Sequence, residues 1–470
     1  MNILLVQPPT GHMLRTHLPK SVESESGVLP PLGLMYAASL VDKKHRVEIL
    51  DCEAERLGEA AISERIRAAA PRIVGVTATT FTIIDALLVA RAAKQVSRDI
   101  LVVLGGAHCD IYPAETLALP DVDFLVLGEG ERPFAKLAEA VERGGSFDFP
   151  GLAYKKDGAP VINPPDAPIE DLDSLPAPDR NAIPRAKYAS LLSPGKLITT
   201  MFTSRGCPFN CSFCYRHTGC RFRARSAASV VDEMAACARD GYEEIFLIDD
   251  TFTVDRARVL AVCAELRRRG LTIAWDARAH INTLDPELIQ AMAKAGCMRL
   301  HIGVEAGTEE VLATLGKKIQ LARIRETFKF TRSIGMETLA YFMIGSPGET
   351  KEQILKTVDF AVELDPDYAQ FSITTPFPAT GLYSAGLRQG FFKTDYWKEF
   401  AANPAPGFSP PYWTKELPED ELLRLLNFAH RKFYWRAKYI LRSLAKTRSL
   451  TELWKKARAG AGILLPSTPD

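Results

Sequence analysis

The sequence lacks the features that mark membrane-spanning, nucleic-acid-binding and secreted proteins. It contains no run of about 18 apolar residues, so we expect no membrane-spanning helix. Its net charge is only +1, which gives no electrostatic reason to expect a nucleic acid as a partner. The first residues, MNILLVQPPT, have neither a basic segment nor a cleavage site, and they predict a strand rather than a signal peptide. We therefore expect a cytoplasmic protein.

Cysteine is also scarce, which argues against a disulfide-rich fold. The chain of 470 residues contains nine cysteines, too few for a disulfide framework at this length. Six of them stand alone in apolar or helical stretches, and we expect them to be buried small side chains in a reducing compartment. These six are Cys52, Cys109, Cys220, Cys237, Cys263 and Cys297.

The other three cysteines lie together in the segment GCPFNCSFCY, with the spacing C-x3-C-x2-C. A structural zinc site needs four ligands, and His217 and Cys220 are near enough in sequence to keep zinc as an alternative. Thiolates are the usual ligands of a 4Fe-4S cluster, and three of them leave one iron with an open coordination position. The spacing therefore favours such a cluster over zinc. The three residues are Cys207, Cys211 and Cys214.

Residues 1–145 alternate short apolar segments with helical patterns. Continuous apolar strands separated by helices indicate a parallel sheet covered on both faces, which is a doubly wound, Rossmann- or flavodoxin-like α/β domain. Such sheets bind ligands at the carboxyl ends of their strands. The expected strands are 2–7, 46–50, 73–77, 100–104 and 123–127, and the expected helices include 32–42, 60–70 and 83–96.

Small and polar residues follow four of these expected strands. Glycines and small hydroxyl side chains let a large flat ligand approach the backbone, although each loop alone could equally be a tight turn or a helix cap. The G-x-G-x-x-G fingerprint is absent, so we do not expect a dinucleotide. The residues expected to line this ligand-binding edge are Pro8, Thr79, Thr80, Gly105, Gly106, His108, Gly128 and Glu129.

The rest of the chain divides into three parts. Residues 146–195 are predicted to form a linker, with a hairpin in YKKDGAPVI that turns at Asp-Gly. Residues 196–380 alternate apolar and helical segments, which predicts a partial parallel (β/α)6 barrel with its catalytic loops at the carboxyl ends of the strands. Residues 381–470 change to long helical patterns. The expected barrel strands are 198–203, 244–248, 272–277, 299–304, 337–344 and 369–374.

Four motifs of the predicted barrel occur in the order found in one enzyme superfamily. The cysteine loop has an aromatic residue before its last cysteine, and the other three motifs are FLIDDTFTVD (246–255), HIGVEAGTEEVL (301–312) and FMIGSPGET (342–350). Together they resemble the radical S-adenosylmethionine (SAM) enzymes over about residues 190–380. Ala306 departs from the family's G-x-E-S-G pattern, in which serine is commoner at this position.

The resemblance implies roles for individual residues. The three cysteines of the loop would hold the cluster, and its open iron would bind SAM, with Phe213 shielding the cluster from water. Glu305 either contacts SAM or pairs with Arg278. Asp249 either faces the cofactor or forms a turn or helix cap. The residues implied to bind SAM are Phe213, Asp249, Glu305, Gly345 and Pro347.

A doubly wound domain before such a barrel, together with the segments PPLG, GGAH and GEGE, resembles the cobalamin-dependent branch of the superfamily. The motif D-x-H-x-x-G, whose histidine ligates cobalt, is absent. The resemblance therefore implies cobalamin bound with its base displaced and with no protein histidine on the cobalt. We expect His108 to contact the edge or tail of the corrin, and His12 is a weaker candidate for the cobalt than His108.

The C-terminal region is basic and aromatic. Between Arg431 and Arg458 the sequence has ten Lys or Arg residues and one Glu, with five aromatic residues among them. Such a segment could lie on an anionic membrane or receive a lipid-like substrate. The alternative is a helix that packs on the barrel with its aromatic residues inside and its charges in water.

We therefore expect a cobalamin-dependent radical SAM enzyme, and specifically a methyltransferase. Its substrate would be a small molecule, lipid or tetrapyrrole with an unactivated carbon, and its reductant a flavodoxin or ferredoxin. Two alternatives remain at this point. One is a radical SAM cyclase or ring-rearranging enzyme without net methyl transfer, and the other is a redox-sensing protein with a structural iron-sulfur cluster.

Overall fold

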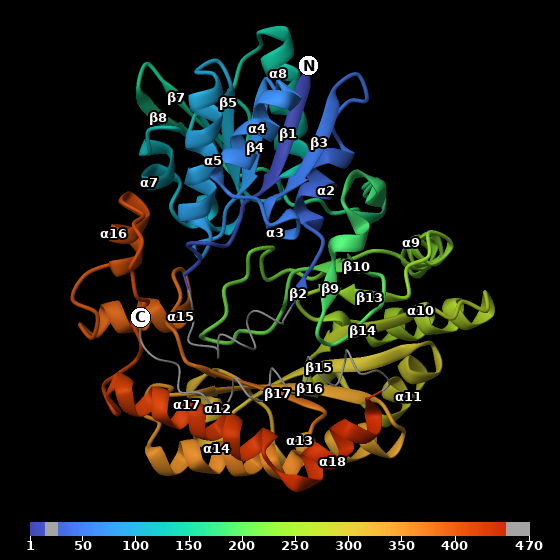
Figure 1. The fold of residues 1–470 in the computed structure, drawn as a ribbon. Coiled ribbons are helices and arrows are strands. Elements are labelled where there is room, and N and C mark those ends of the chain that lie inside the picture. The colour runs from blue at the N-terminus through green and yellow to red at the C-terminus, as the bar shows by residue number, and fades with distance from the viewer. Residues whose placement is uncertain (15–26, 448–470) are drawn as a thin grey trace. The chain divides into compact units, whose positions relative to one another are not determined.

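The computed structural model describes residues 1–14 and 27–447, which form two compact units (Figure 1). The described part of the N-terminal unit comprises residues 1–14, 30–188 and 392–409. The described part of the barrel unit comprises residues 27–29, 189–391 and 410–447. Each unit is built on its own largely parallel sheet, so the mixed α/β class predicted from the sequence is confirmed.

The N-terminal unit is a doubly wound sheet with the strand order β3-β1-β4-β5-β6-β7-β8. Its first five strands are parallel, and α4 and α5 pack together on the sheet, as do α2 and α8 (Figure 1). The strands are β1 (Asn2–Gln7), β3 (Arg46–Asp51), β4 (Ile73–Thr77), β5 (Leu101–Gly105), β6 (Phe124–Val126), β7 (Leu152–Lys156) and β8 (Ala159–Ile162). The helices are α2 (Leu32–Ser39), α3 (Cys52–Glu55), α4 (Glu59–Ala69), α5 (Ile83–Val96), α6 (Ala107–Ile111), α7 (Pro113–Ala118) and α8 (Glu131–Arg143).

The hairpin predicted in the 146–195 segment forms, and it extends this sheet. Strands β7 and β8 pair antiparallel, and β7 pairs antiparallel with β6. The turn places Asp157 at φ +51° and Gly158 at φ +81°, because a two-residue turn that follows the twist of the strands needs positive φ at both positions. The hairpin thus belongs to the N-terminal unit by its contacts.

A late segment of the chain also belongs to the N-terminal unit. Helix α16 (Tyr396–Ala402) packs on α7, and Lys398 lies 3.4 Å from the carboxylate of Glu115. Trp397 and Phe400 are buried. The helical region expected over 381–470 is therefore divided, since residues 392–409 pack on the N-terminal unit and their neighbours pack on the barrel unit.

The barrel unit contains six parallel strands in sequence order, as predicted. They are β10 (Ile198–Met201), β13 (Glu244–Leu247), β14 (Ala274–Ala279), β15 (Cys297–Glu305), β16 (Glu337–Ile344) and β17 (Tyr368–Ile373). The main helices are α9 (Ala227–Arg239), α10 (Arg256–Arg268), α11 (Pro286–Lys294), α12 (Glu309–Thr314), α13 (Leu321–Ser333), α14 (Lys351–Leu364) and α15 (Gly381–Arg388). Short pairs are formed by β2 (Gly27–Val28) with β9 (Ala189–Ser190) and by β11 (Ser204–Arg205) with β12 (Arg223–Ala224).

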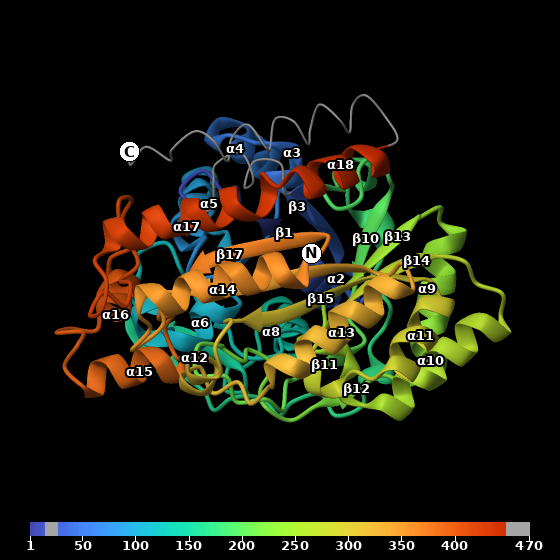
Figure 2. The same ribbon diagram turned by 90° about the horizontal axis from the view of Figure 1, so that it is seen from below.

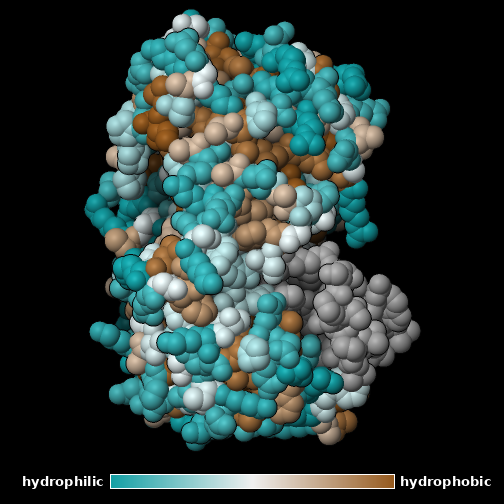
Figure 3. All heavy atoms as spheres, turned by 90° about the vertical axis from the view of Figure 1, so that its left-hand side faces the viewer, coloured by the Kyte–Doolittle hydropathy of each residue, from teal (hydrophilic) through white to brown (hydrophobic). Residues whose placement is uncertain are grey.

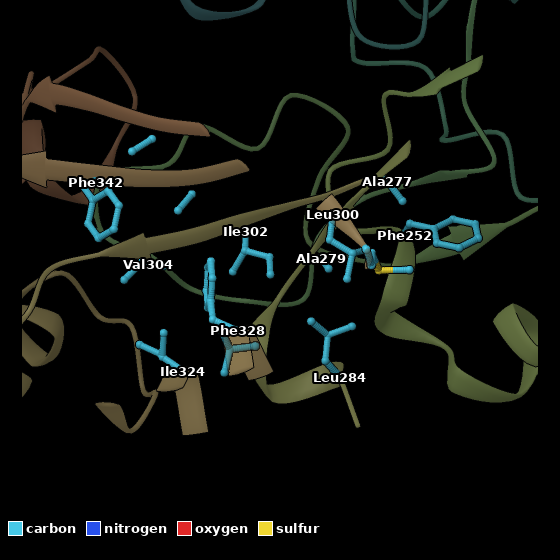
Figure 4. Packing of buried hydrophobic residues seen from close by; sticks show 14 of the residues in the cluster. Phe252, Ala277, Ala279, Leu284, Leu300, Ile302, Val304, Ile324, Phe328 and Phe342 are labelled. Atoms are coloured by element: carbon cyan, nitrogen blue, oxygen red, sulfur yellow. The ribbon is translucent and has the colours of Figure 1, made fainter. Parts of the chain in front are cut away.

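The two faces of the barrel strands differ in character, because successive side chains of a strand point to opposite faces. On β15, Leu300, Ile302 and Val304 are fully buried, and Figure 4 shows them packed with Phe328 of α13 and other apolar side chains. The intervening positions carry Arg299, His301 and other polar residues. The helix-facing side of the sheet is therefore the apolar core, and the opposite side, called here the inner face, is polar.

The described part of the basic C-terminal region packs on the barrel. Helix α17 (Glu419–Tyr434) lies against β17 and α14, and α18 (Ala437–Lys446) follows it (Figure 2). The hydroxyl of Tyr434 donates to the carbonyl oxygen of Ala369 (2.7 Å). Asp365 binds the cationic groups of Arg436, Lys438 and Arg442 at 2.9 to 3.0 Å. Up to residue 447 this region thus consists of helices packed on the barrel, which was the alternative to a membrane-binding segment. Trp454 and Arg458 lie outside the described residues.

No helix within the described ranges is long and apolar enough to cross a membrane. On the face of the molecule drawn in Figure 3, hydrophobic patches lie among hydrophilic residues.

Candidate functional site

The three cysteines lie in a loop that follows β10 and β11 and that the barrel unit holds by its backbone. The N–H of Ser212 donates to the carbonyl of Leu315 (2.9 Å), and the N–H of Leu382 donates to the carbonyl of Ser212 (2.7 Å). At the start of the loop, Gly206 has φ +84°, and a Cβ there would lie 2.1 Å from the carbonyl oxygen of Arg221. Only glycine fits this close approach, which helps to define the path of the loop.

The thiols of this loop are close enough to influence one another. Burial, followed by the nearby thiols of Cys211 and Cys207, raises the pKa of Cys214 to about 11. Cys207 Sγ also lies 3.6 Å from the hydroxyl of Thr251. Metal ligation requires the thiolate form, so iron binding here must release protons. Three neighbouring thiols on a fixed loop fit an iron-sulfur cluster.

Zinc fits this loop less well. Cys220, one of the two extra ligands considered for zinc, is exposed. The expectation that all six isolated cysteines are buried is therefore wrong for Cys220, which lies in a loop, and right for the other five.

Phe213 is half-buried and packs on the edge of the apolar core.

Glu305 ends β15 in a strained conformation beside the cysteine loop. Its φ is +67°, a region that costs a non-glycine residue about 1 kcal/mol or more. Its carboxylate lies 2.6 Å from Lys317 Nζ, which also donates to the carbonyl of Gly303 (2.7 Å). The alternative that Arg278 pairs with Glu305 is wrong, since Lys317 occupies that position. Burial raises the pKa of Cys211. The charges of Lys317, which lowers this pKa, and of Glu305, which raises it, also contribute, so the ion pair lies near the thiols.

A row of polar side chains runs along the inner face of the sheet. Asp276 Oδ2 lies 3.0 Å from His301 Nε2, and His301 Nδ1 lies 2.9 Å from the hydroxyl of Tyr341. At one end of the row, fully buried Arg299 lies 3.4 Å from Asp276 and 3.1 Å from Glu337. The sequence analysis missed this row. The sequence pattern that could have revealed it is a polar residue at every second position of otherwise buried strands.

Arg278 stands out within this row because no carboxylate of residues 1–14 or 27–447 pairs with it. It shares a strand face with Asp276, and it contributes to the pKa of Tyr341, so its guanidinium lies on the inner face. Its one hydrogen bond to a described residue runs from Nη1 to the carbonyl of Ile248 (3.2 Å). The side chain is exposed rather than buried. The inner face thus presents a positive charge that can pair with an anion.

The carboxylate of Asp249 is occupied by a turn. It accepts hydrogen bonds from the N–H and hydroxyl of Thr203 and from the hydroxyl of Ser204, at 2.5 to 2.6 Å. It is buried and ties the segment after β10 to the end of β13. Asp249 therefore forms a turn, which the sequence analysis gave as the alternative to a contact with the cofactor. The neighbouring Asp250 accepts from the hydroxyl of Thr218 (3.0 Å).

The loop that contains Gly345 and Pro347 is shaped by packing and by a buried acid. Gly345 has φ +75°, and a Cβ there would lie 2.8 Å from Leu422 of α17. The N–H of Ser346 donates to Glu349 (2.9 Å), whose other carboxylate oxygen is buried without a hydrogen-bond partner among the described residues. Burial raises the pKa of Glu349 to about 7. Pro347 is half-buried beside this acid.

In the N-terminal unit, the loops after β4 and β5 meet. Gly106 has φ +118°, and a Cβ there would lie 2.7 Å from the carbonyl oxygen of Ala78. His108 Nδ1 lies 3.1 Å from the hydroxyl of Thr80. Thr79 is exposed, and its hydroxyl lies 3.0 Å from that of Thr82. Residues of these two expected loops therefore meet at the carboxyl edge of the sheet, with Thr79 exposed and Thr80 and His108 buried.

The other residues expected on this edge lie at the neighbouring strand ends. Pro8 follows β1 and is buried, and Gly105 ends β5. After β6, the N–H of Gly128 donates to Asp110 (2.7 Å), and Glu129 accepts from the N–H of Ile169 (2.8 Å). Glu129 is thus engaged in holding the segment that leaves the hairpin.

His108 lies inside the unit rather than in an open loop, because α6 begins at Ala107 and turns the imidazole inward. The side chain is 0% exposed, and its burial lowers its pKa to about 4, so the ring is neutral near pH 7. Its Nε2 has no hydrogen-bond partner among the described residues. A buried nitrogen without a partner fits a site that a bound ligand completes.

Comparisons with known proteins agree with the division of the chain into these two units. Residues 201–361 match the family model of the radical SAM superfamily, and residues 22–138 match the model of the B12 binding domain. The chain is 35% identical to an uncharacterized methyltransferase, PH0819, of Pyrococcus horikoshii, over 94% of this chain and 95% of the relative. It is 30% identical to the anaerobic magnesium-protoporphyrin IX monomethyl ester cyclase of Cereibacter sphaeroides, over 87% of this chain and 68% of that enzyme.

A solved structure shares the fold. The radical SAM methyltransferase TsrM from Kitasatospora setae, with tryptophan substrate and a SAM analogue bound, superposes with a TM-score of 0.69. The match covers 83% of this chain and 76% of TsrM at 23% identity, a level at which the likeness concerns the fold alone.

Proposed function

Because this chain belongs to the cobalamin-dependent radical SAM enzymes, which use a 4Fe-4S cluster, SAM and cobalamin, we propose that it transfers a methyl group to an unactivated carbon of its substrate. The observation that carries this proposal is the identity of 35% with a methyltransferase along nearly the whole length of both chains. The proposal is tested by counting the two nucleoside products of SAM and by following its methyl group into the product, as argued in the Discussion.

The proposed roles of this chain's residues follow from their positions. Cys207, Cys211 and Cys214 hold the cluster. The ion pair of Glu305 and Lys317 beside the thiols supplies both an acceptor and a donor for the amino acid part of SAM. When bound, the cluster with SAM supplies a radical that abstracts hydrogen, and cobalamin supplies a transferable methyl group. The further SAM contacts proposed are Phe213, Gly345 and Pro347, whereas Asp249 is assigned to the turn that it forms with Thr203 and Ser204. The cobalamin contacts proposed are Pro8, Thr79, Thr80, Gly105, Gly106, His108, Gly128 and Glu129.

A cyclase or rearrangement without net methyl transfer is the second candidate. It is favoured by one observation, the identity of 30% with a cyclase that acts on a magnesium porphyrin ester. Both candidates need an external reductant, for which we propose a flavodoxin or ferredoxin. They differ in whether the methyl group of SAM reaches the product.

The inner face supports an anionic substrate over a neutral lipid. Arg278 has no carboxylate partner within the described part of the chain, and an unpaired guanidinium favours a carboxylate or phosphate ligand. His301 and Tyr341 add further hydrogen-bonding groups beside it. We therefore propose a tetrapyrrole or another acid as substrate, in preference to an uncharged polycyclic lipid.

We predict that Arg278→Ala removes a preference for acids. The probes are protoporphyrin IX and its dimethyl ester, with binding followed by porphyrin fluorescence. The wild type should bind the acid at least about tenfold more tightly, since a hydrogen bond to a charged group contributes about 1.5 to 3 kcal/mol, and the variant should bind both probes alike. Arg325→Ala, which removes an exposed cation on α13, should behave as wild type. If Arg278→Ala weakens the binding of SAM as well as the binding of the acid, Arg278 contacts SAM rather than the substrate. Equal binding of both porphyrins by the wild type, or no binding of either, would contradict the anionic tetrapyrrole.

Peripheral membrane contact remains a proposal for α18. Its Leu441 and Leu444 are 67% and 49% exposed, and Trp435 before it is 48% exposed, which leaves an apolar surface near several cations. We predict co-sedimentation with phosphatidylserine vesicles at low salt, less of it at high salt, and a loss in Leu441→Ser/Leu444→Ser. Absence of binding at low salt would mean that the region serves only to pack on the barrel.

A further inference from the structure

Arg216 lies against the cysteine loop and reaches back across it. It follows the third cysteine of the loop by two residues. Its Nη1 donates to the carbonyl of Phe209 (3.4 Å), and its Nη2 donates to the side-chain oxygen of Asn210 (3.3 Å). Phe209 and Asn210 stand between the first two cysteines. The guanidinium therefore bridges the two ends of the segment that carries the three thiols.

The positive charge of Arg216 has no counter-ion. Within the part of the chain that the structure describes, no carboxylate pairs with it, and its side chain is half-buried. The other two charges beside the thiols, Glu305 and Lys317, pair with each other at 2.6 Å, so their effects on the loop oppose one another. Burial raises the pKa of the second and third cysteines of the loop, and Arg216 lowers both, so its charge reaches two of the thiols.

We propose that Arg216 raises the reduction potential of the iron-sulfur cluster through its positive charge. This inference rests on the proposed function, in which the three cysteines hold the cluster. Reduction transfers one electron from the flavodoxin or ferredoxin to the cluster, and no bond of the chain forms or breaks. The cluster then carries one more negative charge. A fixed positive charge nearby stabilises the more negative state, so it makes the cluster easier to reduce.

Asp250 provides a charge of the opposite sign on the same loop. The N–H of Gly206, just before the first cysteine, donates to the hydroxyl of Thr218 (2.8 Å), and this hydroxyl donates to Asp250 (3.0 Å). Asp250 is exposed. A negative charge here favours the oxidised cluster. If charge determines the potential, removal of the charge of Asp250 and removal of the charge of Arg216 must shift it in opposite directions.

The test is a potentiometric titration of the reconstituted, full-length protein without SAM, with the reduced cluster measured by electron paramagnetic resonance. At the potential where the wild type is half reduced, Arg216→Gln should show an about tenfold lower ratio of reduced to oxidised cluster. This change corresponds to about 59 mV toward negative potential for one electron. Arg216→Lys, which keeps the charge, should titrate close to the wild type, and Asp250→Asn should shift toward positive potential. Arg325→Gln, which removes an exposed cation of α13, is the control and should titrate as the wild type.

Iron content and circular dichroism separate this role from a structural one. Because the backbone of Ser212 holds the loop, Arg216→Gln should retain full iron and the wild-type fold. An unchanged potential in Arg216→Gln, or an equal shift in Arg216→Lys, overturns the proposal, as do shifts of the same sign in Arg216→Gln and Asp250→Asn. Loss of iron in Arg216→Gln also overturns it and assigns Arg216 to holding the loop. A wild type that binds no reducible 4Fe-4S cluster overturns the proposed function as well.

Discussion

The Cys211→Ala protein is expected to lose both its brown iron-sulfur chromophore and its ability to cleave SAM, while it remains folded. The wild-type cluster already has one iron without a protein ligand, which is the position open to SAM. With Cys211 removed, a second iron also lacks a protein ligand, so the cluster is not held intact. The fold should survive because the loop is held through the backbone of Ser212, by its hydrogen bonds to Leu315 and Leu382, and not through the thiol. Iron content, the visible spectrum and 5′-deoxyadenosine formation under anaerobic reduction measure the effect.

Cys220→Ala is the matched control for this prediction. Cys220 is exposed, lies in the same stretch of chain and was considered as a zinc ligand. We expect its replacement to leave iron content and SAM cleavage at the level of the wild type, whereas Cys207→Ala and Cys214→Ala should behave as Cys211→Ala. The assignment of the ligands is wrong if Cys211→Ala retains full iron and cleaves SAM. Iron bound without any 5′-deoxyadenosine in the wild type would instead support the redox-sensing alternative.

The second large effect concerns the fate of two SAM molecules in each turnover. A saturated carbon has no lone pair with which to attack the methyl group of SAM, so a radical and a separate methyl carrier are both needed. One SAM should therefore yield 5′-deoxyadenosine and methionine, and the other should yield S-adenosylhomocysteine. With SAM carrying a deuterated methyl group, the product should gain the intact labelled methyl, and the two nucleosides should form in about equal amounts.

The design uses anaerobic incubation with a reductant, cobalamin and a set of acidic tetrapyrroles, read by mass spectrometry. The Cys211→Ala protein is the control for label that enters the product without the cluster. A product formed with 5′-deoxyadenosine but with neither label nor S-adenosylhomocysteine would contradict methyl transfer and favour the cyclase candidate. Lipid substrates tested in parallel examine the preference for anions inferred from Arg278.

The sequence by itself determined the fold class and the location of the cluster loop. The segments Ile73–Thr77 and Glu337–Ile344 form strands with the bounds that the sequence predicts. The first is a nearly continuous apolar run, as a strand buried on both faces needs, whereas the second includes half-buried positions among its buried ones. The Asp157–Gly158 turn follows from the positive φ that the turn requires. These features depend on residues that are neighbours along the chain, so a local pattern is sufficient to predict them.

Only the tertiary structure decided which side chains meet. Lys317 rather than Arg278 pairs with Glu305, His108 is turned inward by α6, and residues 392–409 pack on α7 of the N-terminal unit. The hydrogen-bonded row of Asp276, His301 and Tyr341 forms only when three strands align in register. His12 meets Asp85 because β1 and β4 are neighbours in the sheet although the two residues are 73 apart. Such contacts depend on strand order and crossover connections, which bring distant segments together and leave no local pattern in the sequence.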